Sequence, residues 1–257
     1  MEQAAILQAL KTAQAQSATT STTTLTAPDI LADYDLGGVN CKLCDNTGRI
    51  IQRGPGLLEL HVFECGCMKR RRSLRSLRKA GMEDMARRYT LENYVADNKH
   101  RAAVKDAAMR YINSADGWFF IAGQSGSGKT HICTAICTAI MRKQDSEVYF
   151  MPWRDDSVEL KQRLKQEDWY QAKIKKLKRV PVLYIDDFFK GGASDADIKL
   201  AFEILNARYN DTALRTVISS EIDLDGLMRI DEAIGGRIYE RSRGFAVMAP
   251  GENVRLS

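Results

Sequence analysis

Short apolar runs alternate with longer amphipathic stretches from residue 118 onward. Five of these runs are nearly continuous in apolar residues: 118–122, 147–151, 181–186, 215–220 and 245–249. Strands that are apolar on both sides belong to parallel sheets with helices on both faces. The pattern therefore predicts an α/β domain in which a five-stranded parallel sheet is flanked by helices formed by the amphipathic stretches.

One amphipathic stretch, 195–210, carries a clear helix start. Ser194 precedes it, and Asp197 lies three residues later. This is the spacing of a capping box, in which each side chain accepts a hydrogen bond from the other residue's backbone N–H. We therefore expect a helix that begins directly after Ser194.

The loop after the first predicted strand has the sequence GQSGSGKT. It fits the pattern Gly-x-x-x-x-Gly-Lys-Ser/Thr over Gly123, Gln124, Ser125, Gly126, Ser127, Gly128, Lys129 and Thr130. Glycines let the backbone N–H groups face a triphosphate, and the following helix points its positive end at the same anion. Lys129 is predicted to contact the β- and γ-phosphates of ATP, and Thr130 to bind Mg²⁺ through its hydroxyl.

Two acidic residues end the third predicted strand. Asp186 and Asp187 follow an apolar run at the carboxyl end of this strand, where ligands of open α/β sheets bind. We predict that Asp186 holds Mg²⁺ through water and that Asp187 is the general base for the attacking water. Glutamate is common at the second position in such ATPases, and the shorter aspartate predicts slow turnover.

Further polar candidates follow the fourth predicted strand. Ser219 or Ser220 lies at the end of that strand and is a candidate sensor of the γ-phosphate, and Arg237 and Arg241 lie on a predicted helix beyond it. An arginine in such a place can act as a finger on transition-state charge in a neighbouring subunit's site. From the residues alone, an ordinary surface position is the simpler interpretation of either arginine.

Four of the six cysteines form two close pairs. Cys41 and Cys44 make the first pair, and Cys65 and Cys67 make the second. Four thiolates arranged in this way suit a tetrahedral structural Zn²⁺ site. The second pair is tighter than the usual Cys-x-x-Cys, and His61 is an alternative fourth ligand.

The remaining cysteines and two other histidines have simpler interpretations. Cys133 and Cys137 lie at i, i+4 spacing in the predicted helix after the phosphate loop, which is typical of core residues. We assign no metal to His100 or His131.

Composition divides the chain into three parts. Residues 1–36 contain a predicted helix, 3–15, followed by a Ser/Thr-rich segment that is interpreted as a flexible linker. Residues 37–80 are assigned to the zinc module and a basic helix. Residues 81–257 are assigned to the nucleotide-binding domain.

Charge and hydropathy restrict the location and partners of the protein. Lys and Arg total 38 and Asp and Glu total 33, an excess too small to indicate nucleic-acid binding by itself. Basic residues are concentrated in 68–79 and 160–179. These two stretches are either the solvated faces of helices or contacts to the phosphates of a nucleic acid.

The chain does not open with a signal-peptide pattern, and no apolar stretch approaches the roughly 20 residues that span a bilayer. We expect a cytoplasmic protein with reduced cysteines and no membrane partner.

The order of these motifs resembles the bacterial and phage replicative-helicase loaders of the DnaC/DnaI type, which are AAA+ ATPases. The resemblance covers most of the chain and is carried by CKLC…ECGC, TLENY, GQSGSGKTH, VLYIDDFFK, LNARYN, TVISSEIDLDGL, IGGRIYER and GENVR. It implies an AAA+ core. The chain ends a few residues after the fifth predicted strand, so no C-terminal helical lid is expected, as in loaders of this type.

The resemblance also implies roles for individual residues of the nucleotide site. Arg237 corresponds to the arginine finger that acts in a neighbouring subunit, and Arg255 to a second sensor that contacts the nucleotide in its own subunit. Loaders of this type often have asparagine where this chain has Glu221. The first sensor is therefore assigned to Ser220.

Two further regions correspond to binding surfaces of such loaders. The helical stretch 156–179 corresponds to an insertion that is presented to single-stranded DNA, and Lys173, Lys175 and Lys176 are the lysines predicted to contact it. The zinc region corresponds to the part that grips the helicase.

These features imply an ATP-dependent loader that binds a hexameric replicative DNA helicase and delivers it onto single-stranded DNA. It would use ATP, Mg²⁺ and Zn²⁺, and would form a homo-oligomer when ATP is bound. Two alternatives stay open. One is a transposition helper of the same ATPase lineage, whose members usually begin differently. The other is a nucleotide-switched adaptor with little hydrolysis, for which Asp187 is the main support.

Overall fold

The computed structural model describes residues 40–53 and 60–249. The predicted helix 3–15, the predicted linker and Arg255 lie outside these residues. The described strands are β1 (Arg49–Arg53), β2 (Leu60–Glu64), β3 (Trp118–Ala122), β4 (Val148–Pro152), β5 (Val182–Phe188), β6 (Arg215–Ser220) and β7 (Ala246–Met248). The described helices are α3 (Cys67–Lys79), α4 (Glu83–Arg88), α5 (Lys99–Asn113), α6 (Lys129–Lys143), α7 (Trp153–Gln162), α8 (Glu167–Arg179), α9 (Asp195–Tyr209), α10 (Leu224–Ile230) and α11 (Glu232–Arg241). Within the described part of the chain, none of the helices has both the length and the apolar character that a membrane span requires.

The larger sheet has five parallel strands in the order β4-β5-β6-β3-β7. β3 precedes the phosphate loop and β5 carries the paired acids, and only β6 lies between them. Parallel strands end at the same edge of a sheet, so this order brings the phosphate loop, the acids and the end of β6 together. The predicted α/β fold with a five-stranded parallel sheet is confirmed, and the strand ends differ from the predicted ones by two residues at most.

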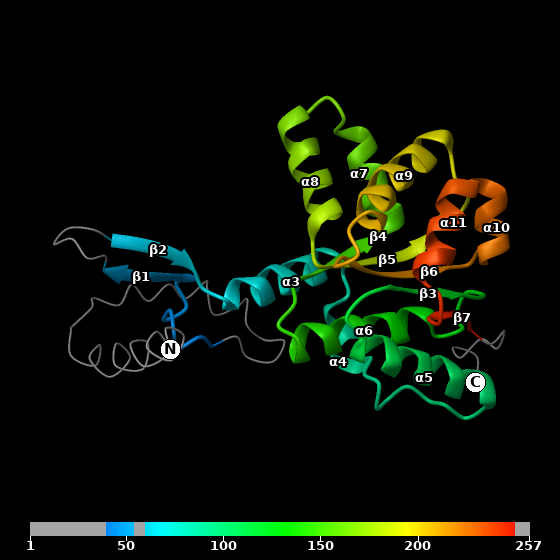
Figure 1. Ribbon diagram of the computed structural model, residues 1–257, viewed down its shortest axis with the longest axis horizontal. Coiled ribbons are helices and arrows are strands. Elements are labelled where there is room, and N and C mark those ends of the chain that lie inside the picture. The colour runs from blue at the N-terminus through cyan, green and yellow to red at the C-terminus, as the bar shows by residue number, and fades with distance from the viewer. Residues whose placement is uncertain (1–39, 54–59, 250–257) are drawn as a thin grey trace, which may run out of the picture. The chain divides into compact units, whose positions relative to one another are not determined.

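Helices cover both faces of this sheet (Figure 1). Successive side chains of a strand point to opposite faces. In β3, Phe119 and Ile121 belong to the core formed with α5 and α6, whereas Trp118 and Phe120 belong to the core formed with α7 to α11. The near-continuous apolar strands of the sequence therefore supply two hydrophobic cores, one on each face.

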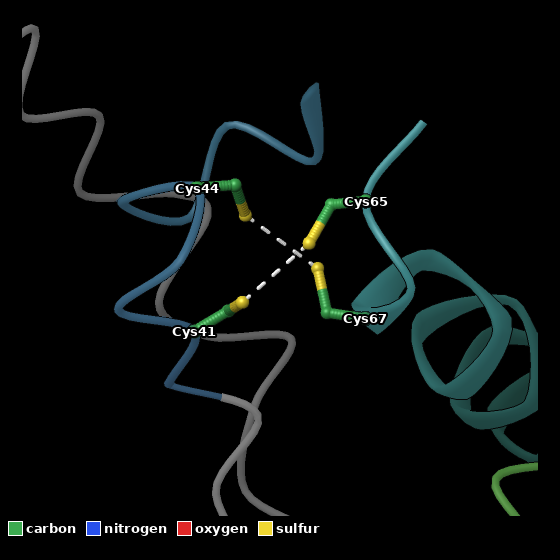
Figure 2. A group of neighbouring side chains, drawn as sticks. All are labelled: Cys41, Cys44, Cys65 and Cys67. Carbon is green, nitrogen blue, oxygen red and sulfur yellow. Dashed lines mark hydrogen bonds between the residues drawn. The ribbon is translucent and has the colours of Figure 1, made fainter. Parts of the chain in front are cut away.

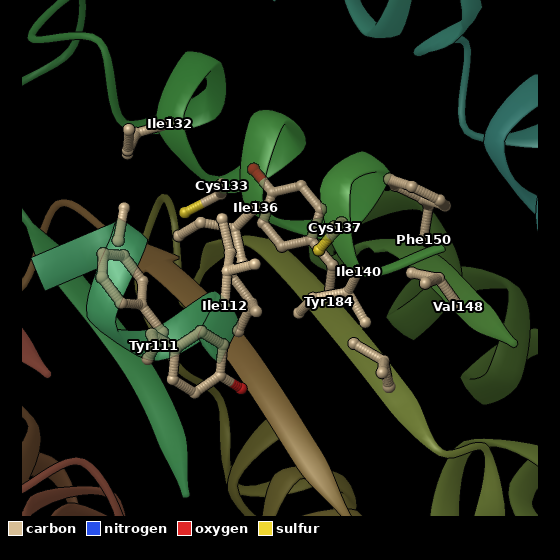
Figure 3. Close-up of a cluster of buried hydrophobic side chains, with 14 of the residues drawn as sticks. Tyr111, Ile112, Ile132, Cys133, Ile136, Cys137, Ile140, Val148, Phe150 and Tyr184 are labelled. Atoms are coloured by element: carbon tan, nitrogen blue, oxygen red, sulfur yellow. The ribbon is translucent and has the colours of Figure 1, made fainter. Parts of the chain in front are cut away.

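The core between the sheet and α6 contains both cysteines of that helix. Cys133 and Cys137 lie among apolar side chains that include Ile136 of the same helix and Tyr184 of β5 (Figure 3). Burial raises the pKa of both thiols. They are core residues, as predicted.

Helix α9 begins with the predicted capping box. The Asp197 N–H donates to Ser194 Oγ at 3.3 Å, and the Ser194 N–H donates to Asp197 Oδ2 at 3.2 Å. Both bonds join residues that are three apart in the sequence. The start of this helix could therefore be predicted from the sequence alone.

Helix α3 covers the outer edge of β4. Outward-pointing backbone groups of an edge strand have no strand partner, and two serines of α3 provide one. The Val148 N–H donates to Ser73 Oγ at 2.8 Å. Ser76 Oγ accepts from the Phe150 N–H at 3.3 Å and donates to the Val148 carbonyl at 3.1 Å. The basic helix that composition groups with the zinc module is thus packed on the large sheet, and the domain boundary at residue 80 stays a prediction.

Removal of the Ser76 hydroxyl should destabilise the protein by about 1–3 kcal/mol, because the Phe150 N–H and the Val148 carbonyl would lose their partner. Chemical denaturation of Ser76→Ala measures this change in the free energy of unfolding. Ser242→Ala is the matched control, since Ser242 is also buried but donates to the Ile238 carbonyl, four residues earlier in the chain. Equal losses in the two variants would contradict a role for Ser76 at the strand edge.

Candidate nucleotide-binding site and metal centre

The phosphate loop connects β3 to α6, and its course depends on glycine. Gly126 and Gly128 have φ values of 82° and 89°, in the left-handed region that glycine adopts without strain. Gly128 directly precedes α6. The first N–H groups of a helix have no partner within it, and together with the positive end of the helix they form a site for an anion.

A cavity of about 260 Å³ lies against this loop. It is lined by Tyr89, Ser125, Gly126, Gly128, Lys129, Thr130, His131, Asp187 and Lys190. The structure thus brings five of the predicted phosphate-loop residues together with one of the two paired acids. It also adds three residues to which the sequence analysis gave no role in nucleotide binding.

Lys129 lies within the phosphate loop. Its Nζ donates hydrogen bonds to the carbonyl oxygens of Gly123 and Gln124, both at 2.8 Å. Burial lowers the pKa of Lys129, and the nearby carboxylates of Asp187 and Glu221 oppose this effect. The Lys129 ammonium group lies at the anion site, and its hydrogen bonds are to carbonyls of the loop. It can therefore exchange these carbonyls for the phosphate oxygens of a bound nucleotide.

Asp186 accepts three hydrogen bonds at one carboxylate oxygen. Its Oδ1 lies 2.5 Å from Tyr184 Oη, 2.6 Å from Ser219 Oγ and 3.3 Å from Thr130 Oγ1. Burial raises the pKa of Asp186, while the hydrogen bonds from Ser219 and Tyr184 lower it. The Asp186 carboxylate and the Thr130 hydroxyl are the hard oxygen donors that Mg²⁺ prefers. They fit the predicted magnesium site, which stays a prediction.

Asp187 is set apart from Asp186 by a β-bulge. In the pairing of β5 with β6, Asp186 and Asp187 together face the single residue Ser219. Asp187 has a φ of 53°, and its N–H donates to Ser219 Oγ at 2.9 Å. A bulge re-aims one side chain of a strand, and here Asp187 lines the cavity while Asp186 is bonded to Thr130.

The two candidate serines at the end of β6 have different surroundings. Ser219 Oγ donates to Asp186 and accepts from the Asp187 N–H. Ser220 Oγ donates to the Phe188 carbonyl at 2.9 Å and accepts from the Ile222 N–H at 3.0 Å, and the residue is fully buried. The assignment of the first sensor to Ser220 stays a prediction, but the contacts to the paired acids favour Ser219.

Neither candidate arginine finger lines the cavity of its own chain. Arg237, on α11, donates from Nε to Asn206 Oδ1 at 3.0 Å, and its guanidinium lies over the rings of Phe202 (4.8 Å) and Tyr209 (5.4 Å). Arg241 donates to the Thr212 carbonyl, in the loop between α9 and β6. A role for Arg237 in a neighbouring subunit stays a prediction, and Arg255 lies outside the described residues.

Three cavity residues, Tyr89, His131 and Lys190, were assigned no role in the nucleotide site from the sequence. Tyr89 and His131 stack with ring centroids 4.4 Å apart, and His131 Nε2 lies 3.0 Å from the Thr90 carbonyl oxygen. Lys190 follows β5 and pairs with Asp187 at 2.8 Å. The TLENY block, which begins at Thr90, was the only sequence signal near Tyr89, and nothing in the local sequence connects it to the phosphate loop.

The four clustered cysteines form a candidate metal centre. Their sulfurs converge from the turn before β1 and from the junction of β2 with α3, and all lie within 4.8 Å of one another (Figure 2). Two separations are 3.6 Å, Cys41 to Cys65 and Cys44 to Cys67. Zn–S bonds of about 2.3 Å in a tetrahedron place sulfurs about 3.8 Å apart, so this donor set fits Zn²⁺.

His61 is not part of this group. It lies in β2 opposite Gln52, and the metal-ligand cluster found among the described residues consists of the four cysteines. The geometry therefore favours four thiolate ligands over a cysteine and histidine combination. The cluster could hold zinc.

The predicted DNA-binding insertion forms α7, α8 and the turn between them, and the structure corrects one of its residues. The Lys173 side chain is 9% exposed, pairs with Asp156 at 3.1 Å and donates to Tyr149 Oη. The prediction that Lys173 contacts DNA is wrong, because this face of α8 points at the core. Lys176 is half-buried over the Tyr149 ring, whereas Lys175 is exposed.

The fold and the site define the chain as an AAA+ ATP-binding protein whose core has the same fold as DnaC. The family model described as IstB-like ATP binding protein matches residues 57–234. The chain belongs to this family. Membership implies ATP binding and ATPase activity.

Three curated relatives show how far the similarity extends. XkdC of the phage-like element PBSX of Bacillus subtilis (strain 168) is 30% identical over 242 residues, which cover 88% of this chain and 88% of XkdC. YqaM of the same strain is 30% identical over 210 residues, which cover 76% of this chain but 65% of YqaM, just under two thirds of its length. A putative ATP-binding protein of insertion sequence IS232 from Bacillus thuringiensis subsp. berliner is 29% identical over 116 residues, 45% of this chain and 44% of that protein.

Among solved structures, the DnaC helicase loader superposes with a TM-score of 0.58 at 23% identity. The superposition covers 63% of this chain and 97% of that chain. At this identity the similarity establishes the fold of the ATPase core.

Proposed function

We propose that the protein is an ATP-dependent loader that binds a hexameric replicative DNA helicase and delivers it onto single-stranded DNA. The observation that carries the proposal is a four-cysteine cluster joined through α3 to an ATPase core with the fold of the DnaC helicase loader. A cytoplasmic location and assembly of several ATP-bound copies follow from this role.

Bound ATP with Mg²⁺ would supply a γ-phosphate whose loss changes the charge within the site. In the proposed mechanism Lys129 would leave the loop carbonyls for the phosphates, and Thr130 and Asp186 would hold the metal. Asp187 would orient the attacking water and accept its proton, while the bond between the γ-phosphate and the leaving ADP breaks. Arg237 completes the site of the neighbouring copy, so assembly depends on ATP.

The zinc module is the proposed helicase-binding part. Several apolar side chains of the β1–β2 hairpin are exposed, among them Ile51 (65%), Val62 (57%) and Phe63 (51%). Exposed apolar patches of this kind are typical of protein interaction sites. A structural Zn²⁺ held by the four cysteines would order the hairpin that presents them.

Complex formation with the cognate hexameric helicase tests this function. We expect size-exclusion chromatography with light scattering to show a complex, and ATP to promote transfer of the helicase to circular single-stranded DNA. Val62→Asp should weaken the complex without changing ATP affinity, because Val62 is exposed on the hairpin and lies outside the nucleotide site. The absence of a complex both with and without ATP would overturn the proposal.

A transposition helper is the second candidate, supported by the family match and by the insertion-sequence relative. That relative aligns with less than half of this chain, whereas XkdC aligns with 88% of it. Capture of the purified chain by a transposase, in place of a helicase, would decide for this candidate.

A nucleotide-switched adaptor with little hydrolysis is supported by the surroundings of Asp187, whose carboxylate is paired with Lys190. This ion pair would have to open before the Asp187 carboxylate could accept a proton from the attacking water. ATP turnover measured with and without single-stranded DNA distinguishes an ATP-hydrolysing loader from a nucleotide-switched adaptor. A rate that stays near zero in both conditions, with ATP still bound, would favour the adaptor.

Single-stranded DNA binding should depend on the exposed face of α8. Lys175 and Arg179 are exposed and lie one turn apart on this helix. We expect Lys175→Glu/Arg179→Glu to weaken binding at low salt by at least about tenfold and to reduce its salt dependence. Fluorescence anisotropy with a labelled oligonucleotide over a salt series measures both quantities.

The matched control for this experiment is Arg142→Glu/Lys143→Glu. These residues are exposed in the last turn of α6, on the opposite face of the sheet, and the double change alters net charge equally. Equal losses in the two variants would show a general charge effect and would assign no DNA contact to α8.

A further inference from the structure

Lys190 links two carboxylates at the edge of the nucleotide cavity. Its Nζ lies 2.8 Å from Asp187 Oδ2 and 3.3 Å from Glu221 Oε1. Asp187 belongs to β5, and Glu221 directly follows the neighbouring strand β6. The three side chains are each between 31% and 38% exposed, so the group is open to a ligand that enters the cavity.

The backbone fixes the position of Lys190. Asp187 and Phe189 have φ values of 53° and 57°, and the Lys190 N–H donates to the Asp187 carbonyl at 3.0 Å, so the chain turns back on itself. Phe188 and Phe189 are fully buried and stacked at 4.0 Å, and both pack against the Trp153 ring. The turn is therefore anchored in the core, and Lys190 is held next to Asp187.

The carboxylates around the cavity oppose the binding of a triphosphate. Asp186 and Asp187 already place two carboxylates at the strand ends, and Glu221 adds a third where an uncharged asparagine would add none. A triphosphate brings further negative charge to the same place, and like charges at close range disfavour binding. Lys190 contacts two of the three carboxylates, which reduces their repulsion of the phosphates.

We propose that Lys190 is a positioning residue of the nucleotide site, which neutralises Glu221 and holds the Asp187 carboxylate so that a nucleoside triphosphate can bind beside both. This inference rests on the proposed ATP site. It explains how the site can bind a triphosphate although Glu221, after β6, adds a negative charge beside the phosphates. Lys190 and Glu221 act as one charged unit, so the effect of losing the lysine depends on the presence of the glutamate.

Charge rescue tests this coupling. We expect Lys190→Met to weaken ATP affinity at low salt by about tenfold or more, with a smaller effect on ADP, which lacks the γ-phosphate. Lys190→Met/Glu221→Gln should recover most of the lost affinity, and Lys190→Arg should bind ATP within about threefold of the wild type. Isothermal titration calorimetry in the presence of Mg²⁺ gives these affinities without relying on hydrolysis.

Glu221→Gln alone provides a check that does not require removal of the lysine. It should bind ATP at least as tightly as the wild-type protein, because one carboxylate beside the phosphates is lost. Thermal unfolding of all variants would show that the fold is intact.

Three results would overturn the role of Lys190: unchanged ATP affinity in Lys190→Met, no recovery in the double variant, or weaker binding in Glu221→Gln. If the wild-type protein itself bound no ATP, both this inference and the proposed function would fail. Wild-type binding together with any of the three results would remove the role of Lys190 alone.

Discussion

Lys129→Ala should lower ATP affinity and ATP turnover by at least about a hundredfold, a loss typical of removing one preorganised donor from a charged site. The Lys129 ammonium lies within the phosphate loop and is held by the Gly123 and Gln124 carbonyls. Without it the loop retains its backbone N–H groups but loses the side chain that reaches the phosphates. Calorimetric titration with ATP and a coupled phosphate-release assay measure the two quantities.

The fold should survive this change. Burial lowers the pKa of Lys129, which means that the folded state disfavours the charged ammonium, and its removal relieves this penalty. Lys143→Ala is the control, because Lys143 is exposed at the opposite end of the same helix. It should bind and hydrolyse ATP like the wild type. Equal turnover in wild type and Lys129→Ala would refute the assignment of the phosphate loop.

The second large effect is expected at the cysteine cluster. Protein purified without chelators should contain about one zinc ion per chain, and Cys44→Ser/Cys65→Ser should contain almost none. The β1–β2 hairpin has no buried residue in β2, and a two-stranded hairpin is at best marginally stable in water. Zinc binding, which contributes on the order of 10 kcal/mol in small metal modules, would therefore maintain this part of the fold.

Hydrogen exchange can localise that effect. In the double serine variant, or after chelation, the amides of β1 and β2 should exchange rapidly while those of the large sheet stay protected. Cys133→Ala is the control, because Cys133 lies in the core of the large sheet. It should keep its zinc even if it is less stable. Metal analysis that finds no zinc in the wild-type protein would exclude the metal centre.

The sequence predicted those features that depend on residues close together in the chain. The strands of the large sheet were visible as apolar runs, the start of α9 as Ser194 followed by Asp197, and the phosphate loop as spaced glycines before Lys129. Each signal reports a local preference, either of side-chain periodicity or of backbone dihedrals. Such preferences act before and independently of the tertiary fold.

The functions of other residues could not be read in this way, because their partners are distant in the chain. Arg208, in the LNARYN block, is an example. Its guanidinium is fully buried and donates to the carbonyls of Leu177, Val180 and Arg215 and to Thr216 Oγ1. Arg208 therefore has a structural role, because it joins α9 to the end of α8 and the start of β6. No local sequence pattern indicated this role.

The division between the two kinds of information is clearest at the nucleotide site. By itself the sequence determined that the chain has a phosphate loop, an acidic strand end and a four-cysteine module, because each is a short pattern with its own chemistry. Only the tertiary structure decided that a bulge separates Asp187 from Asp186, that Ser219 contacts both, and that Lys190 faces Glu221. These contacts cross from β5 to β6, strands separated in the chain by α9, and so depend on sheet register, which local sequence does not specify.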